Sequence, residues 1–160
     1  MIYLGVDPGR SSGAVAAIID DEVRFIKLSE TESDISLWID DLVWENGVFA
    51  YLEQVAARPG QGVSSMFKFG QSYGFVRGLL VAHGVSFETV TPGVWQRKMG
   101  CLSGGDKQVT KARAQELFPQ YARAITNKTA DALLLAEYCR RQRGASGAAK
   151  TSDSQLPTAR

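Results

Sequence analysis

Short apolar or alternating runs bounded by turn residues recur along the chain, a pattern typical of β-strands. Five such runs are present: Ile2 to Val6, Gly13 to Ile19, Glu22 to Leu28, Val48 to Leu52 and Phe87 to Val90. Asp20-Asp21, between the second and third runs, predicts a tight hairpin turn. The fourth run is apolar throughout, which indicates a strand buried on both faces.

Other stretches carry apolar residues at helical spacing or begin with a good helix cap. They are about residues 31–45, Ser64 to His83, Lys107 to Phe118 and Asn127 to Arg143, with a short segment starting at Val94-Trp95. Thr31 or Ser33 can cap the first helix, and Asn46-Gly47 can end it.

Three antiparallel strands followed by strands that alternate with helices predict an α/β fold. We expect a five-stranded mixed sheet with helices on both faces. The length of 160 residues suits one domain, assigned to residues 1–143. Residues 144–160 contain almost no large apolar side chain, which predicts a disordered C-terminal tail.

Cysteine usage and hydropathy indicate a cytoplasmic protein with no membrane partner. Cys101 and Cys139 have no metal-binding or redox-pair spacing, so they are expected to be reduced thiols. Met1 leads directly into a predicted strand without a basic leader, and the apolar runs are too short to span a bilayer.

Charge is distributed unevenly along the chain although the net charge is only +1. Residues 1–57 contain three Lys/Arg and eleven Asp/Glu, whereas residues 58–160 contain fifteen and six. A basic half of this kind suits a polyanion such as nucleic acid, although ordinary solvated faces would give the same count. Its cations include Arg97, Lys98, Lys107, Lys111, Arg113, Arg123 and Lys128.

Three acids occupy positions that suit a metal site. Asp7 and Glu53 end the first and fourth predicted strands, and Asp131 lies in the first turns of the last helix. If those strands are parallel neighbours, both acids leave the same sheet edge, and a helix across that edge can add Asp131. Mg²⁺ prefers such oxygen ligands, and paired ions assist phosphodiester hydrolysis.

Each acid also has a simpler interpretation. Asp7 precedes Pro8-Gly9 and could only shape a turn. Glu53 could be a surface charge, although an acid directly after a buried run is costly unless it faces a site. Asp131 could be a first-turn acid that favours the helix dipole. The ordered set of three favours the site.

Four motifs in this order resemble the RuvC family of Holliday junction resolvases, which have a ribonuclease H-like fold. They are Leu4-Gly-Val-Asp-Pro-Gly9 with Ser12-Gly13, Leu52-Glu-Gln-Val55, Phe69-Gly-Gln-Ser-Tyr-Gly74 and Ala130-Asp-Ala-Leu133. The resemblance covers about residues 1–143. Pro92-Gly-Val-Trp95 and the segment from Lys111 to Pro119 are more similar to the phage-type branch.

The resemblance implies a homodimeric endonuclease that binds a four-way DNA junction and nicks two strands symmetrically. It implies Mg²⁺, with Mn²⁺ able to substitute, held by Asp7, Glu53 and Asp131. A phage-encoded enzyme of this kind would act in the host cytoplasm on recombining or replicated DNA. Expected DNA contacts are Arg58, Arg97, Lys98, Lys107 and Lys111.

The long middle helix forms the dimer interface in that family, which implies an interface containing Met66, Phe67, Phe69 and Phe75. A monomer could instead pack these side chains into its own core. The family's aromatic wedge after the strand-four glutamate is replaced by Ala56 here. Met66, Phe67 or Arg58 could take that role.

A second departure is Lys128, which stands where family members have an acid or a histidine. Three interpretations are open: Lys128 contacts the scissile phosphate or replaces part of a cation's charge, Asn127 supplies a neutral oxygen ligand, or the site is weakened. We expect a working site with Lys128 as a positively charged catalytic residue.

Other function classes fit parts of the pattern. One is a junction-binding protein that does not cut, and another is a ribonuclease H-like nuclease acting on forks or RNA–DNA hybrids. Sugar kinases and actin-like proteins also open with an Asp-x-Gly strand end, but their two domains need far more than 160 residues.

Overall fold

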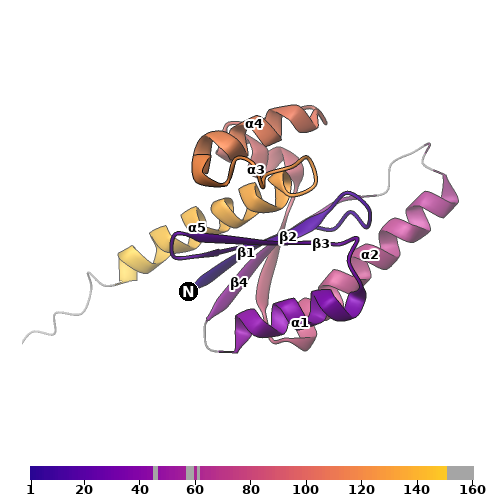
Figure 1. Ribbon diagram of the computed structural model, residues 1–160, viewed down its shortest axis with the longest axis horizontal. Helices are drawn as coiled ribbons and strands as arrows, with labels where there is room; N and C mark the ends of the chain where they lie inside the picture. Colours follow the sequence, from indigo (N-terminus) through magenta and orange to yellow (C-terminus); the bar gives the residue numbers. More distant parts are fainter. Residues whose placement is uncertain (45–46, 57–59, 61, 151–160) are drawn as a thin grey trace, which may run out of the picture.

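The chain folds into a five-stranded mixed sheet with helices on both faces (Figure 1). The computed structural model describes residues 1–44, 47–56, 60 and 62–150, the last six as backbone only. The strands are β1 (Ile2–Asp7), β2 (Ala14–Ile19), β3 (Glu22–Lys27), β4 (Val48–Glu53) and β5 (Ser86–Val90). The helices are α1 (Glu32–Val43), α2 (Val63–Ala82), α3 (Pro92–Met99), α4 (Lys107–Leu117) and α5 (Ala130–Lys150), with a 3-10 turn η1 (Pro119–Tyr121).

Strand order is β3-β2-β1-β4-β5, which confirms the predicted fold class. β1, β2 and β3 pair antiparallel, and Asp20 in the hairpin between β2 and β3 has a φ of 52°. β4 runs parallel to both β1 and β5. Val6 lies opposite Leu52, so the residues that follow them leave the sheet at the same edge.

One face of the sheet is covered by α1 and α2 (Figure 1). The Thr31 side chain caps α1 by accepting a hydrogen bond from the Asp34 amide. Ile35, Ile39 and Leu42 of α1 pack into the same apolar cluster as Val76 and Leu80 of α2. Helix α1 ends at Val43, and the predicted stop at Asn46 lies outside the described residues. His83 is the C-cap residue of α2.

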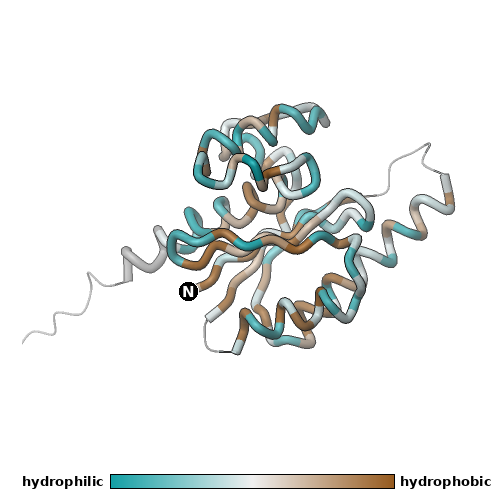
Figure 2. The backbone as a smooth tube through the Cα atoms, in the orientation of Figure 1, coloured by the Kyte–Doolittle hydropathy of each residue, from teal (hydrophilic) through white to brown (hydrophobic). Residues whose placement is uncertain are grey.

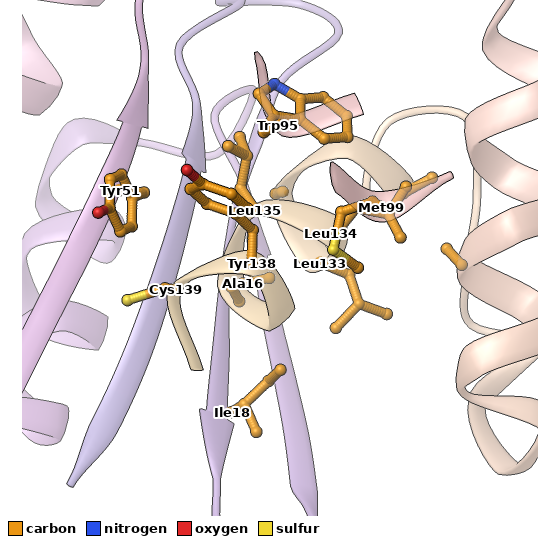
Figure 3. Close-up of a cluster of buried hydrophobic side chains, with 14 of the residues drawn as sticks. Ala16, Ile18, Tyr51, Trp95, Met99, Leu133, Leu134, Leu135, Tyr138 and Cys139 are labelled. Carbon is orange, nitrogen blue, oxygen red and sulfur yellow. The ribbon is translucent and has the colours of Figure 1, made fainter. Parts of the chain in front are cut away.

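The other face is covered by α5, with α3 and α4 packed over it. Figure 3 shows α5 side chains against Ala16 and Ile18 of β2 and beside Trp95 and Met99 of α3. Gly5 of β1 allows the close approach, because a Cβ there would lie 2.1 Å from the Ala132 carbonyl oxygen and 2.2 Å from the Ala136 amide. The missing side chain of Gly5 therefore fixes how deeply α5 sits.

Helix α5 continues to Lys150, past the predicted start of the tail at residue 144. Residues 145–150 include three alanines, the best helix formers, and they extend a helix that is already nucleated. Helix α5 thus extends beyond Arg143, where the sequence pattern predicted its end. Residues 151–160 lie outside the described part, and the division into a nuclease domain and a tail remains a prediction.

Apolar residues concentrate in the strands, and many polar residues lie along the outer helix α4 (Figure 2). This distribution matches a sheet buried on both faces. None of the helices in the described ranges is long and apolar enough to cross a membrane.

Candidate active site

Three carboxylates from distant parts of the chain come together where β1 and β4 end. Asp7 is the last residue of β1, Glu53 the last of β4, and Asp131 the second of α5. Their exposed fractions are only 6%, 7% and 4%. Burying acids together is costly unless cations or hydrogen bonds compensate them, so this cluster has the character of a functional site.

The cluster changes the proton affinity of two of its members. Burial, together with the Asp131 charge, raises the pKa of Asp7 to about 6, although Lys107 and the Gly9 amide oppose the shift. Burial and the neighbouring Asp7 raise the pKa of Glu53 to about 7. Both carboxyls therefore gain from a nearby positive charge when they ionise.

That charge is supplied by Lys107, the first residue of α4. Its ammonium forms an ion pair with Asp131 Oδ2 and lies 3.6 Å from Asp7 Oδ2. Burial disfavours the charged ammonium, but Asp7 and Asp131 outweigh this and raise the pKa of Lys107. The sequence predicted a phosphate contact for Lys107 but not that it would join two of the acids.

Local chain geometry brings Lys107 to the acids. Gly104 and Gly105 have φ values of 59° and 102°, which favour glycine, and Asp106 caps α4 by accepting from the Gln108 amide. The Gly-Gly-Asp run was the available sequence signal for this turn, although it could not indicate the partner of the lysine.

Two hydrogen bonds orient the carboxylates. The Trp95 indole Nε1 donates to Glu53 Oε1 at 3.0 Å from a fully buried ring, and the Gly9 amide donates to Asp7 Oδ1 at 3.2 Å. Trp95 was noted only as part of a resemblance motif, because no local pattern shows that its indole faces Glu53. The site opens into a cavity of about 420 Å³ lined by Glu53, Lys107, Asp131 and the loop around Gly104.

The donor set fits a hard divalent cation. Asp7 Oδ2 and Asp131 Oδ1 are buried oxygens that accept no hydrogen bond from any described residue, although the Lys107 ammonium lies 3.6 Å from Asp7 Oδ2. Unpaired carboxylate oxygens of this kind suit ligands of a cation. In the described ranges, no three His, Cys, Asp or Glu side chains are gathered closely enough to hold one ion. Two carboxylates with water and substrate phosphate are a common way of holding Mg²⁺, so the residues present suit that ion.

Among the described residues, the Lys128 side chain forms no ion pair or hydrogen bond with the three acids. Helix α5 begins at Ala130, so Lys128 lies in the preceding turn, where its amide donates to Thr126 Oγ1, and its side chain is exposed. It makes no ion pair within the described part of the chain. Asn127 is exposed in the same turn. The catalytic role of Lys128 remains a prediction.

The predicted DNA contacts lie at different depths. Arg97 and Lys98 are exposed in the last turn of α3, and Lys111 is half-buried one turn after Lys107. Arg58 lies outside the described residues. Their contacts with DNA remain predictions.

The four predicted interface residues of α2 divide into two pairs. Phe67 is 67% exposed and Met66 39%, whereas Phe69 and Phe75 are half-buried. Phe75 packs against the α1–α2 cluster, and the Phe69 ring stacks on Tyr73 with centroids 6.3 Å apart. The protomer itself therefore uses part of the apolar surplus of this helix, which was the alternative interpretation.

No protein-family model and no curated protein matches this sequence. Solved structures of similar fold include two of RuvC. RuvC of Thermus thermophilus in complex with a Holliday junction substrate matches with a TM-score of 0.59 and 14% identity, covering 90% of this chain and 96% of that chain. A second structure of Thermus thermophilus RuvC matches with a TM-score of 0.55 and 16% identity, covering 90% and 97%. The chain therefore has a RuvC-like, ribonuclease H-like fold.

Proposed function

We propose that this protein is a divalent-metal-dependent endonuclease that resolves four-way DNA junctions and acts on related branched DNA. The observation that carries the proposal is the buried set of Asp7, Glu53 and Asp131, in which two oxygens lack a hydrogen-bond partner. The fold similarity to RuvC, one structure of which holds a Holliday junction substrate, supports the choice of DNA substrate.

Asp7, Glu53 and Asp131 would supply the carboxylate ligands for Mg²⁺, or Mn²⁺ in its place, two of them to an ion, with water and substrate phosphate completing its coordination. The bound ion supplies an activated water and charge stabilisation at the phosphodiester. Trp95 and the Gly9 amide keep Glu53 and Asp7 in fixed orientations, so ligand geometry does not have to be organised at the moment of binding. This preorganisation is the protein's own contribution to the rate.

Lys107 would exchange partners when substrate binds. It neutralises Asp7 and Asp131 while they lack another cation. Once another cation neutralises Asp7 and Asp131, the Lys107 ammonium can turn to a phosphate in the adjoining cavity, which Lys107 also lines. Arg97, Lys98, Lys111 and Lys128 would add positive charge along the DNA path.

The proposal includes a homodimer that places two such sites on one nearly symmetric junction. Val63, Phe67 and Val81 are large exposed apolar side chains on α2. They share one helical face with Gly70, Gly74 and Gly78, where an added Cβ would meet nothing within 4 Å. This face of α2 has apolar side chains near both ends of the helix and only glycines in the middle. Such a face can pack closely against the same helix of a second copy.

The test is cutting of a labelled four-way junction compared with linear duplex in Mg²⁺, mapped on all four strands. We expect paired nicks at symmetric positions and no cutting by Asp7→Asn, which keeps the side chain's size. Equal cutting of linear duplex would contradict junction specificity. Cutting by Asp7→Asn would contradict the assigned centre.

A second candidate is a protein that binds junctions without cutting them. It is favoured by the position of Lys107 between two of the acids and by the missing three-ligand cluster within the described residues. In that case the wild type would bind the junction but leave it intact, while Lys128→Asp or Lys128→His would restore cutting. Cutting by the wild type excludes this candidate.

A further inference from the structure

A second, larger cavity lies on the opposite face of the sheet from α5, between the β1–β2 turn and α2. Its volume is about 710 Å³, within the range of small-ligand pockets. Its lining includes Arg10, Ser12, Lys68, Phe69, Gln71 and Phe75. None of these residues belongs to the carboxylate site.

The cavity has fixed walls. The buried Ser72 hydroxyl donates to the Pro8 carbonyl at 2.7 Å, which joins α2 to the β1–β2 turn. An Arg10 guanidinium nitrogen donates to the Leu28 carbonyl at 2.8 Å, which holds that side chain at the rim. The site is therefore largely formed before any ligand binds.

The lining combines four kinds of chemistry. Phe69 and Phe75 provide aromatic surface, Arg10 and Lys68 provide positive charge, and the serines with Gln71 provide hydrogen-bonding groups. Glu32 adds one carboxylate, which leaves a balance of one positive charge in the lining. The Lys68 ammonium makes no ion pair with any residue that the structure describes. Aromatic faces beside cations are the combination that binds single-stranded nucleic acid, since bases stack and phosphates pair with charge.

We propose that this cavity binds one nucleotide of a DNA strand that is unpaired at the branch point, with its base against Phe69 and its phosphate near Arg10 and Lys68. The inference rests on the proposed function, because branched DNA supplies such nucleotides. It assigns the cavity a DNA subsite separate from the cutting centre.

The cavity is connected to the cutting centre through the β1–β2 turn. Gly9 lines the cavity, and its amide donates to Asp7 Oδ1 at 3.2 Å. A nucleotide seated beside Gly9 would therefore press on the same turn that orients Asp7. Occupancy by an unpaired nucleotide would thus favour cutting near a branch over cutting in continuous duplex.

The test measures binding without cutting, by fluorescence anisotropy in EDTA, with the full chain and three probes. The probes are a twelve-residue thymidine oligomer, a linear duplex and a four-way junction. Phe69→Leu should weaken oligomer binding about tenfold by removing the stacking face, and change duplex binding less than twofold. Phe69→Tyr, which keeps that face, should bind as the wild type does.

Lys68→Ala should weaken binding of the oligomer and the junction. The slope of log binding constant against log salt concentration should also become shallower by about 1, as expected for the loss of one phosphate contact. Lys27→Ala is the charge-matched control, because alternation along β3 puts its side chain on the sheet face away from α2. Lys27→Ala should change binding of each probe less than twofold. Equal losses in Lys68→Ala and Lys27→Ala would overturn the subsite.

Sedimentation and thermal melting of each variant separate a subsite from a dimer or folding effect. If Phe69→Leu keeps its assembly state and melting temperature and still binds the oligomer as the wild type does, the inference is wrong. Junction cutting by the wild type in that case would leave the proposed function standing. If the oligomer effects appear but no junction is cut in Mg²⁺, the subsite stands and the proposed function fails.

Discussion

Helices α5 and α2 have nearly the same length, 21 and 20 residues, but very different surroundings. Every residue of α5 from Ala130 to Cys139 is buried, whereas only Ser72, Val76 and Leu80 of α2 are. Figure 1 shows α5 lying along the sheet and the start of α2 extending away from it. The comparison separates the helix that builds the carboxylate site from the helix whose surface is available to partners.

The largest expected effect is the loss of DNA cutting when Asp131, a residue of α5, is changed. Asp131→Asn removes one ligand charge without changing the side chain's size, and we expect junction cutting to fall about a thousandfold. Single-turnover cutting in Mg²⁺ measures it. Junction binding in EDTA is the control and should stay within about threefold; cutting at the wild-type rate would exclude Asp131 from the site.

Gly5→Ala should break the contact that seats α5. The new Cβ would overlap the Ala132 carbonyl oxygen, so the helix must shift, and we expect the free energy of unfolding to fall by about 3 kcal/mol. Urea unfolding measures the loss. Gly70→Ala in α2 is the matched control at concentrations where the protein is monomeric: its Cβ meets no described residue within 4 Å, so the stability of the monomer should hold or rise by about 0.5–1 kcal/mol. Equal losses would erase the distinction between the helices.

Stability should depend on pH through the buried acids. Asp7 ordinarily titrates near 3.8 but has a pKa of about 6 in the folded protein, so the folded state holds a proton that the unfolded state has lost. Without divalent metal, stability should therefore fall as pH rises between these values. From pH 4.5 to 7, Asp7→Asn should gain about 2 kcal/mol relative to wild type, measured by urea unfolding in EDTA. A constant difference would contradict the raised pKa.

The smallest expected effect concerns the exposed face of α2. Phe67→Glu places a charge on that face and should weaken the proposed dimer at least tenfold, because a buried interface would have to desolvate it. Sedimentation over a concentration range measures the dimer association constant. The free energy of unfolding of the monomer should change by less than about 0.5 kcal/mol. An unchanged association constant would place the dimer contact elsewhere.

Much of the fold could be predicted from local pattern. Strand alternation and the hairpin at Asp20 were sufficient for the sheet, and the parallel pairing of β1 with β4 brings Asp7 beside Glu53 as expected. Asp131 followed from its place in the first turns of a helix expected to cross that edge of the sheet. In each case the local sequence was enough to place the residue at the end of a strand or the start of a helix.

The remaining site contacts depend on long-range geometry. Lys107 and Asp131 are 24 positions apart, and Trp95 and Glu53 are 42 apart, so no spacing rule joins them. Lys128 was assigned from its place in the family resemblance, which could not show that its side chain is exposed in the turn before Ala130. The α5 end was misplaced because small residues fit both a loop and a helix.

The hydrogen bond between Trp95 and Glu53 gives the protein an optical reporter of its own centre. Trp95 is fully buried with its indole N–H on a carboxylate, whereas Trp44 is 82% exposed and its emission would report mainly solvent. In a chain with Trp38 and Trp44 replaced by phenylalanine, the emission of Trp95 would respond to any change of charge on Glu53. Ion binding and protonation at the site could then be followed by fluorescence in the absence of DNA.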